Sequence, residues 1–158
     1  MKRLVRIFIL IIAVLVLVVP YAIFSFTYVS PQEEVFLSLG KYEIVEYCSE
    51  GSWQDFTKYY ELTYEKSNIE NNKYLKQMTN TDIEEFNLYL DNFEEWVALV
   101  TDETYGGNKQ FLETYDFDRE IISTKDYCFI NVYGEPDSYD LYFYDTETEI
   151  LYYFHNNT

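Results

Sequence analysis

The chain has 158 residues, of which 48% are hydrophobic and 20% are aromatic, and its formal net charge at pH 7 is −17. This negative charge repels phosphate backbones, so nucleic acid is not an expected partner. The aromatic content separates the chain from acidic proteins that stay disordered because they have too little apolar surface to bury.

The first predicted element is the uncharged, apolar stretch formed by residues 7–26. As a helix it would be roughly 30 Å long, which is the thickness of the hydrocarbon core of a bilayer. Lys2, Arg3 and Arg6 precede it, and the first charged residues after it are Glu33 and Glu34. Since positive charge is retained in the cytoplasm, we predict a single-pass protein of the cell membrane with a cytoplasmic N-terminus and an extracytoplasmic C-terminal domain.

This segment is interpreted as an uncleaved signal anchor within residues 1–29. A cleavable signal peptide is the alternative, but its apolar region is usually shorter and is followed by a small-x-small cleavage site. Proline removes one backbone hydrogen bond, so a kink is expected where it interrupts the helix. The side chains that mark the predicted membrane helix are Ile7, Leu10, Val14, Leu17, Pro20 and Phe24.

Residues 30–158 are predicted to form one extracytoplasmic domain. They contain 8 of the 11 basic residues and all 28 acidic ones, which gives this segment a net charge of −20. They also contain 16 of the 18 tyrosines. A segment of this length can bury a hydrophobic core of its own.

The domain is expected to begin with a short helix over residues 31–39. Ser30 can cap this helix, Pro31 suits its first position, Glu33 can bond back to the cap, and Gly40 can end it. Residues 41–48 fit a strand or a helix. Residues 56–64 alternate as a strand would and are rich in aromatic and β-branched side chains, so a strand is favoured there.

The clearest soluble element is an amphipathic helix over residues 82–99. Thr81 and Glu84 have the spacing of a capping box. Apolar residues then recur at intervals of three and four, which predicts that one side of this helix faces a core. The residues of this apolar stripe are Ile83, Phe86, Leu90, Phe93, Val97 and Val100.

The C-terminal part is predicted to form strands over residues 126–133, 139–144 and 149–155, separated by two turns. Residues 117–122 are a candidate for one strand more. Two successive hairpins form an antiparallel meander, and a sheet with a helix packed on one face is an α+β fold.

Cys48 and Cys128 would lie in a compartment where disulfides persist. Their spacing does not show that they meet, so a disulfide and a pair of buried free thiols are both consistent with the sequence. Cys-x-x-Cys spacing is absent, which argues against redox or zinc chemistry.

Catalytic signatures are missing from the sequence. His155 is the single histidine, which excludes a multi-histidine zinc site and most Ser-His or Cys-His nucleophile systems, and a structural role is expected for it. Carboxylates are abundant, and we interpret them as solvated, with no bound metal or cofactor predicted. Two groups of them have spacings worth checking for a divalent cation: Asp116, Asp118 and Glu120, and the turn residues Asp137, Asp140, Asp145, Glu147 and Glu149.

The predicted function is binding. A negative field attracts cationic partners, and tyrosine is favoured in interfaces because it offers rigid apolar area with one polar tip. We therefore predict a membrane-anchored interaction domain for a cationic protein, peptide or wall polymer. The alternatives are a carboxylate-based hydrolase with Trp53 and Trp96 in its cleft, and an accessory subunit whose membrane helix contacts a larger complex.

Overall fold

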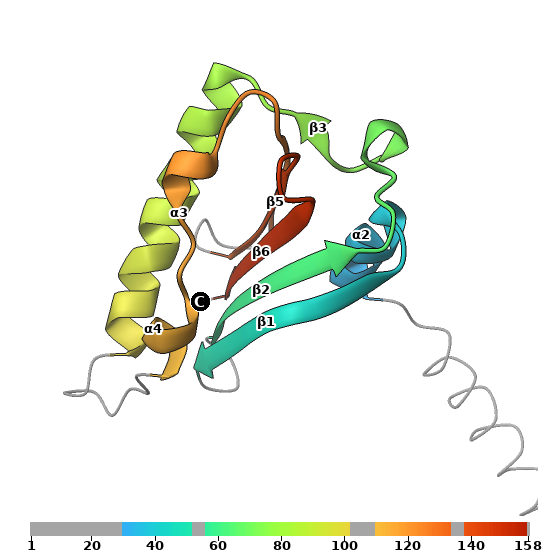
Figure 1. Cartoon of the computed structure of the whole chain (residues 1–158). Helices are drawn as coiled ribbons and strands as arrows, with labels where there is room; N and C mark the ends of the chain where they lie inside the picture. The colour runs from blue at the N-terminus through green and yellow to red at the C-terminus, as the bar shows by residue number, and fades with distance from the viewer. Residues whose placement is uncertain (1–29, 52–55, 102–109, 134–137, 158) are drawn as a thin grey trace, which may run out of the picture. The chain divides into compact units, whose positions relative to one another are not determined.

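A computed structural model describes residues 30–51, 56–101, 110–133 and 138–157 (Figure 1). Contacts divide the chain into Met1–Glu34 and Val35–Thr158, and the sheet and its two cores described below belong to the second unit. Within the described residues, no helix has both the length and the apolar character needed to cross a bilayer. The predicted anchor lies outside them, and so do its marker residues Ile7, Leu10, Val14, Leu17, Pro20 and Phe24.

The centre of the domain is a six-stranded antiparallel sheet with the strand order β1-β2-β6-β5-β4-β3. This confirms the predicted α+β class and the C-terminal meander. The strands are β1 (Tyr42–Gly51), β2 (Phe56–Tyr64), β3 (Lys76–Gln77), β4 (Tyr127–Val132), β5 (Tyr139–Asp145) and β6 (Ile150–Asn157).

Strand β6 lies in the middle of this sheet, between β2 and β5. It therefore joins the hairpin of β1 and β2 to the meander of β4, β5 and β6. The segment that was ambiguous in the sequence, residues 41–48, belongs to β1. A β-bulge between Ile44 and Glu46 interrupts its register with β2.

Helix α2 (Pro31–Leu39) has the predicted limits. Ser30 Oγ accepts a hydrogen bond from the Glu33 amide at 3.1 Å, as expected for a cap. The helix is followed by Gly40, whose φ of +134° disfavours any side chain, and a Cβ there would lie 2.8 Å from the Lys66 carbonyl oxygen.

Helix α3 (Asn80–Val100) begins two residues before the predicted start, and the predicted capping pair Thr81 and Glu84 is wrong. Thr79 Oγ1 accepts from the Asp82 amide at 3.3 Å, and Asp82 Oδ2 accepts from the Thr79 amide at 2.8 Å. Lys76 Nζ donates to Asp82 Oδ1 at 2.6 Å. Lys76 and, next, Thr79 lower the pKa of Asp82 to about 2.

The two faces of the sheet are covered by different helices (Figure 1). Helix α3, together with the short α4 (Gln110–Thr114), covers one face, which we call the α3 face. Residues Val35–Leu39 of α2 and the segment around the 3-10 helix η1 (Ile69–Asn71) cover part of the other, the α2 face. Alternation along each strand therefore assigns successive side chains to two separate cores.

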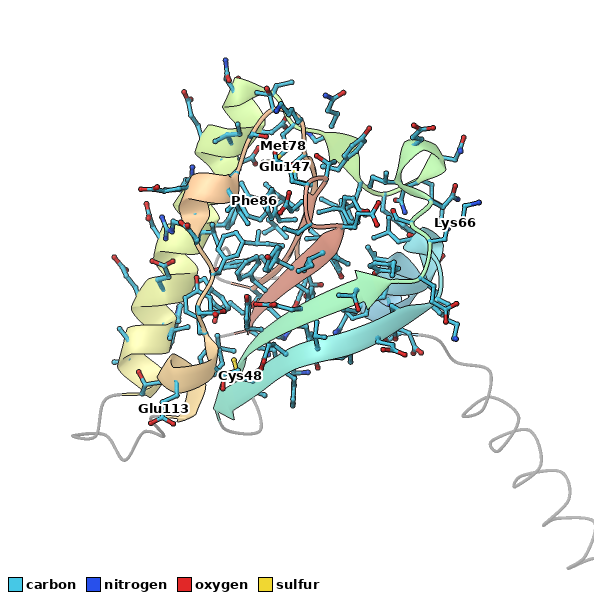
Figure 2. All side chains as sticks on the ribbon, viewed as in Figure 1. Cys48, Lys66, Met78, Phe86, Glu113 and Glu147 are labelled. Atoms are coloured by element: carbon cyan, nitrogen blue, oxygen red, sulfur yellow. The ribbon has the colours of Figure 1, made fainter. Side chains whose placement is uncertain are left out.

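From Ile83 to Val97 the apolar stripe of α3 faces the sheet as predicted, although Ile83 is only half-buried. Figure 2 shows Phe86 pointing from α3 toward the strands, where its ring centroid lies 5.9 Å from that of Phe143. The residues of the stripe that are fully buried are Phe86, Leu90, Phe93 and Val97.

Residues 117–122 do not form the additional strand that was considered for them. They contain the 3-10 helix η3 (Arg119–Ile121). Arg119 Nη1 lies 2.6 Å from Asp91, and Arg119 Nη2 lies 2.9 Å from Glu94, both on α3. These ion pairs hold the segment against the helix, while Phe117 is buried in the core beneath it.

Candidate functional site

The outer edge of β1 is the most accessible apolar part of the described sheet. β1 is the terminal strand, so this edge faces no other strand among the described residues. Residues 43–47 are all exposed. Ile44, Val45 and Tyr47 are 50%, 54% and 52% exposed, which is high for large apolar side chains in a sheet.

The bulge in β1 sorts the exposed side chains into two rows. Ile44 pairs with Leu62 and Tyr47 pairs with Tyr60, so both side chains lie on the α2 face although they are three residues apart. Glu43 pairs with Thr63 and Glu46 pairs with Glu61, on the opposite face. An extended strand at this edge would therefore meet apolar groups on one side and carboxylates on the other.

Tyr47 is held in place by an aromatic row that crosses the sheet. Its ring stacks on Tyr60 at 4.8 Å with an interplanar angle of 15°, and Tyr60 stacks on Tyr153 at 5.4 Å. Tyr142 and Phe129 continue the row across β5 and β4. Since these pairs are directly opposite in register, the row fixes the orientation of the exposed Tyr47 ring.

The carboxylates beside β1 form a negative region on the α3 face. Burial raises the pKa of Glu61, and the charges of Asp116 and Glu46 raise it further, while a hydrogen bond from Tyr59 lowers it. Glu46 and Asp116 are exposed. Lys41, just before β1, forms an ion pair with Glu65, with 2.7 Å between Nζ and Oε1.

A second group of polar side chains lies on the α2 face, in the row next to the aromatic one. His155 Nδ1 lies 2.7 Å from Asp140 Oδ1 and 2.9 Å from the Tyr133 hydroxyl. Tyr153 donates to Asp140 Oδ1 at 2.6 Å, and Asn131 donates to Asp140 Oδ2 at 3.3 Å.

This polar group resembles part of a catalytic triad, but its environment is that of a structural network. His155 and Asp140 are 9% and 6% exposed, and the hydrogen bonds around Asp140 satisfy a buried carboxylate. The two cysteines face the other side of the sheet, so neither is available to this histidine as a nucleophile. The structural role expected for His155 agrees with this arrangement.

The two cysteines are free and buried. Cys48 is on β1 and Cys128 is on β4, with β2, β6 and β5 between them. Adjacent strands are about 4.8 Å apart, whereas a disulfide joins Cα atoms that are roughly 4.4–6.8 Å apart. The structure therefore has the pair of buried thiols. Burial raises the pKa of Cys48 to about 12 and that of Cys128 to about 11.

Several of the acidic residues in the two candidate metal groups have other partners. The Asp118 side chain caps η3 by accepting from the Glu120 amide at 2.9 Å. Asp145 accepts from the Glu147 amide at 2.8 Å and from the Thr148 hydroxyl at 2.6 Å. Asp137 lies outside the described residues. Across the ranges that the structure describes, no three His, Cys, Asp or Glu side chains are grouped as metal ligands.

Of the two tryptophans expected in the cleft of a carboxylate hydrolase, the structure describes one. Trp53 lies outside the described residues, and Trp96 lines a surface hollow with Glu95 and Leu99 of its own helix. Glu61, the carboxyl with the raised pKa, interacts directly with Asp116. Glycosidases instead keep their two carboxyl groups about 5 Å or more apart to leave room for the sugar.

Comparison of the chain with protein-family models, with curated protein sequences and with solved structures gave no match. The chemistry of the exposed residues is therefore the basis for a functional proposal. The sequence does not predict the exposed edge of β1, because the bulge interrupts the alternation of its side chains. The sequence feature that could have indicated it is the run of Ile, Val and Tyr interspersed with glutamates.

Proposed function

We propose that this chain is a membrane-anchored binding protein whose acidic domain, outside the cytoplasm, captures a cationic protein, peptide or wall polymer. The exposed run of residues 43–47 carries this proposal, because it combines large apolar side chains with carboxylates. The net charge of −20 after residue 29 supports it by attracting cationic partners over a distance. The apolar stretch of residues 7–26 supports the membrane location.

The location has a direct test. Protease added outside intact cells or spheroplasts is expected to digest the domain, because the basic residues before Ile7 keep the N-terminus inside. Protection of residues 30–158 until the membrane is broken would contradict the proposed orientation. The mass of the mature protein separately distinguishes an anchored chain from one cleaved near residue 26.

Binding is tested by cross-linking in native membranes. A photo-reactive amino acid in place of Tyr47 in the full chain is expected to form adducts with a basic partner, and the yield should fall as salt rises. The same amino acid at Leu88, which is 67% exposed on α3, is the matched control. Equal adducts at both positions would show charge-driven adsorption and would overturn the proposal.

An unrelated acidic domain of equal charge on the same anchor is the second control. Equal retention of the partner by this domain would mean that the acidic surface serves solubility only. In a third variant, residues 1–29 are fused to an uncharged domain. If this fusion still retains the partner, the chain is instead an accessory subunit that binds through its membrane segment.

A further inference from the structure

The backbone of β1 offers a specific mode of binding. A terminal strand presents backbone N–H and C=O groups along its outer edge, and an extended peptide can pair with them as an additional strand. The exposed run of residues 43–47 provides such an edge on the described sheet. Beyond this run, helix α4 contacts β1 and Cys48 is buried. The accessible part of β1 is therefore its first half.

We propose that the outer edge of β1 accepts an extended segment of a cationic protein, which pairs with it and alternates basic with apolar residues. This inference rests on the proposed function and narrows the partner to a polypeptide. Apolar residues of the added strand would cover Ile44 and Tyr47 on the α2 face. Its lysine or arginine residues would lie on the opposite face, beside Glu43 and Glu46.

Charge selects this partner over a second copy of the chain. Pairing of β1 with another β1 would place Glu43 and Glu46 beside the same carboxylates, and like charges on adjacent strands are destabilising. A basic strand gains from the same charges that repel a copy.

The other edge of the sheet lacks this preference. There β3 covers only Tyr127 and Cys128 of β4, which leaves the rest of the strand, including the half-exposed Val132, at the edge. The hollow beside it is lined by Lys76 as well as Glu85, so the charges are mixed. A cationic strand is therefore directed to β1.

The test uses the full chain in lipid nanodiscs and a fluorescent peptide of about ten residues in which lysine alternates with valine, long enough to cover β1. Binding is expected, together with slower hydrogen exchange in residues 42–47, because outward-facing amides gain partners. A peptide of equal charge with alternate backbone amides N-methylated cannot donate those hydrogen bonds and is expected to lose most of the affinity. Equal binding of both peptides would overturn strand pairing.

A charge-reversed pair of variants locates the edge. Glu43→Lys with Glu46→Lys is expected to weaken binding about tenfold, because two cross-strand pairs change from attractive to repulsive. Glu84→Lys with Glu95→Lys makes the same change in net charge at exposed positions of α3 and is the control. Equal weakening by both pairs would show that only the overall charge matters and would overturn the assignment to β1.

The outcomes separate this inference from the function on which it rests. If a native partner cross-links at position 47 but N-methylation and the β1 variants change nothing, the binding function stands and strand pairing is wrong. If cross-linking at position 47 fails and the peptide also binds no better than to an equal-charge control domain, both are wrong.

Discussion

The capping pair of α3 provides a prediction at the scale of single residues. Thr79→Ala is expected to lower the free energy of unfolding by about 1 kcal/mol, because the first turn of the helix loses an acceptor. Thr81→Ala is the matched control, since Thr81 is exposed and lies after the cap. Thermal melting of the detergent-solubilised full chain compares the two. A larger loss at Thr81 would contradict the observed helix start.

Asp82 makes this cap sensitive to acid. Its pKa of about 2 in the folded chain lies below the usual value of about 3.9 in an unfolded chain. A lowered folded pKa gives stability that is fully present above about pH 4 and is lost as the pH falls toward about 2. The stability difference between the parent and Asp82→Asn is therefore expected to shrink across this window. A difference that stays constant would show that the carboxylate is not ionised in the native contact.

The cysteines provide a second prediction at this scale. Both thiols are buried and their pKa values are raised, so neither is expected to react with a thiol reagent in the native chain. After denaturation without reductant, two thiols per chain are expected to react, since the sequence has two cysteines. No reaction after denaturation would reveal a disulfide and would contradict the strand order that separates them.

Local sequence could not decide the cap of α3. Thr79 and Asp82 have a capping-box spacing, and so do Thr81 and Glu84. The choice depends on Lys76, which reaches Asp82 from β3 and belongs to a different element. By contrast, Ser30, Pro31 and Gly40 were sufficient to place α2, because the signals at its two ends have no nearby competitor.

At the scale of elements, the burial of α3 predicts a large effect on stability. Phe93 is fully buried against Phe154, with 5.3 Å between the ring centroids. Phe93→Ala is expected to cost roughly 3–5 kcal/mol in the free energy of unfolding, as aromatic truncations in cores do. Leu88→Ala, on the exposed side of the same helix, is expected to change it by less than about 0.5 kcal/mol. Similar denaturation midpoints for the two variants would contradict the observed orientation of α3.

Two elements show where periodicity stops being informative. In β1 the bulge places Ile44 and Tyr47 on one face although they are three residues apart, which is the spacing of a helix. Residues 117–122 have strand-like composition, but Arg119 pairs with two carboxylates of α3 and the segment turns as a 3-10 helix. The strands of the meander pair without such interruptions, so the alternation of their side chains predicts their faces.

The whole molecule is expected to unfold in alkali because of its buried tyrosines. Burial raises the pKa of Tyr64, Tyr142 and Tyr153, and that of Tyr152 to about 12, whereas tyrosine in an unfolded chain titrates near pH 10. A raised folded pKa gives stability that is complete below about pH 10 and is lost as the pH rises above it.

Tyrosinate absorbance and far-ultraviolet circular dichroism, recorded together, test this expectation. The exposed tyrosines should ionise first, and the buried ones should ionise in one step with the loss of the circular dichroism signal. Ionisation of all tyrosines near pH 10 with an unchanged spectrum would contradict the observed burial. The effect belongs to the whole domain, because these tyrosines come from β2, β5 and β6.

The central position of β6 has a consequence for the speed of folding. The hairpin of β1 and β2 and the meander of β4, β5 and β6 each form from neighbouring parts of the chain, but β2 and β6 meet across a long separation, as in the hydrogen bond from Thr57 to Asn156 over 99 positions. Closing so long a loop costs entropy before any contact repays it. We therefore expect the pairing of β2 with β6 to be the slow step of folding, because the two locally formed parts of the sheet can cover their aromatic faces only when it occurs.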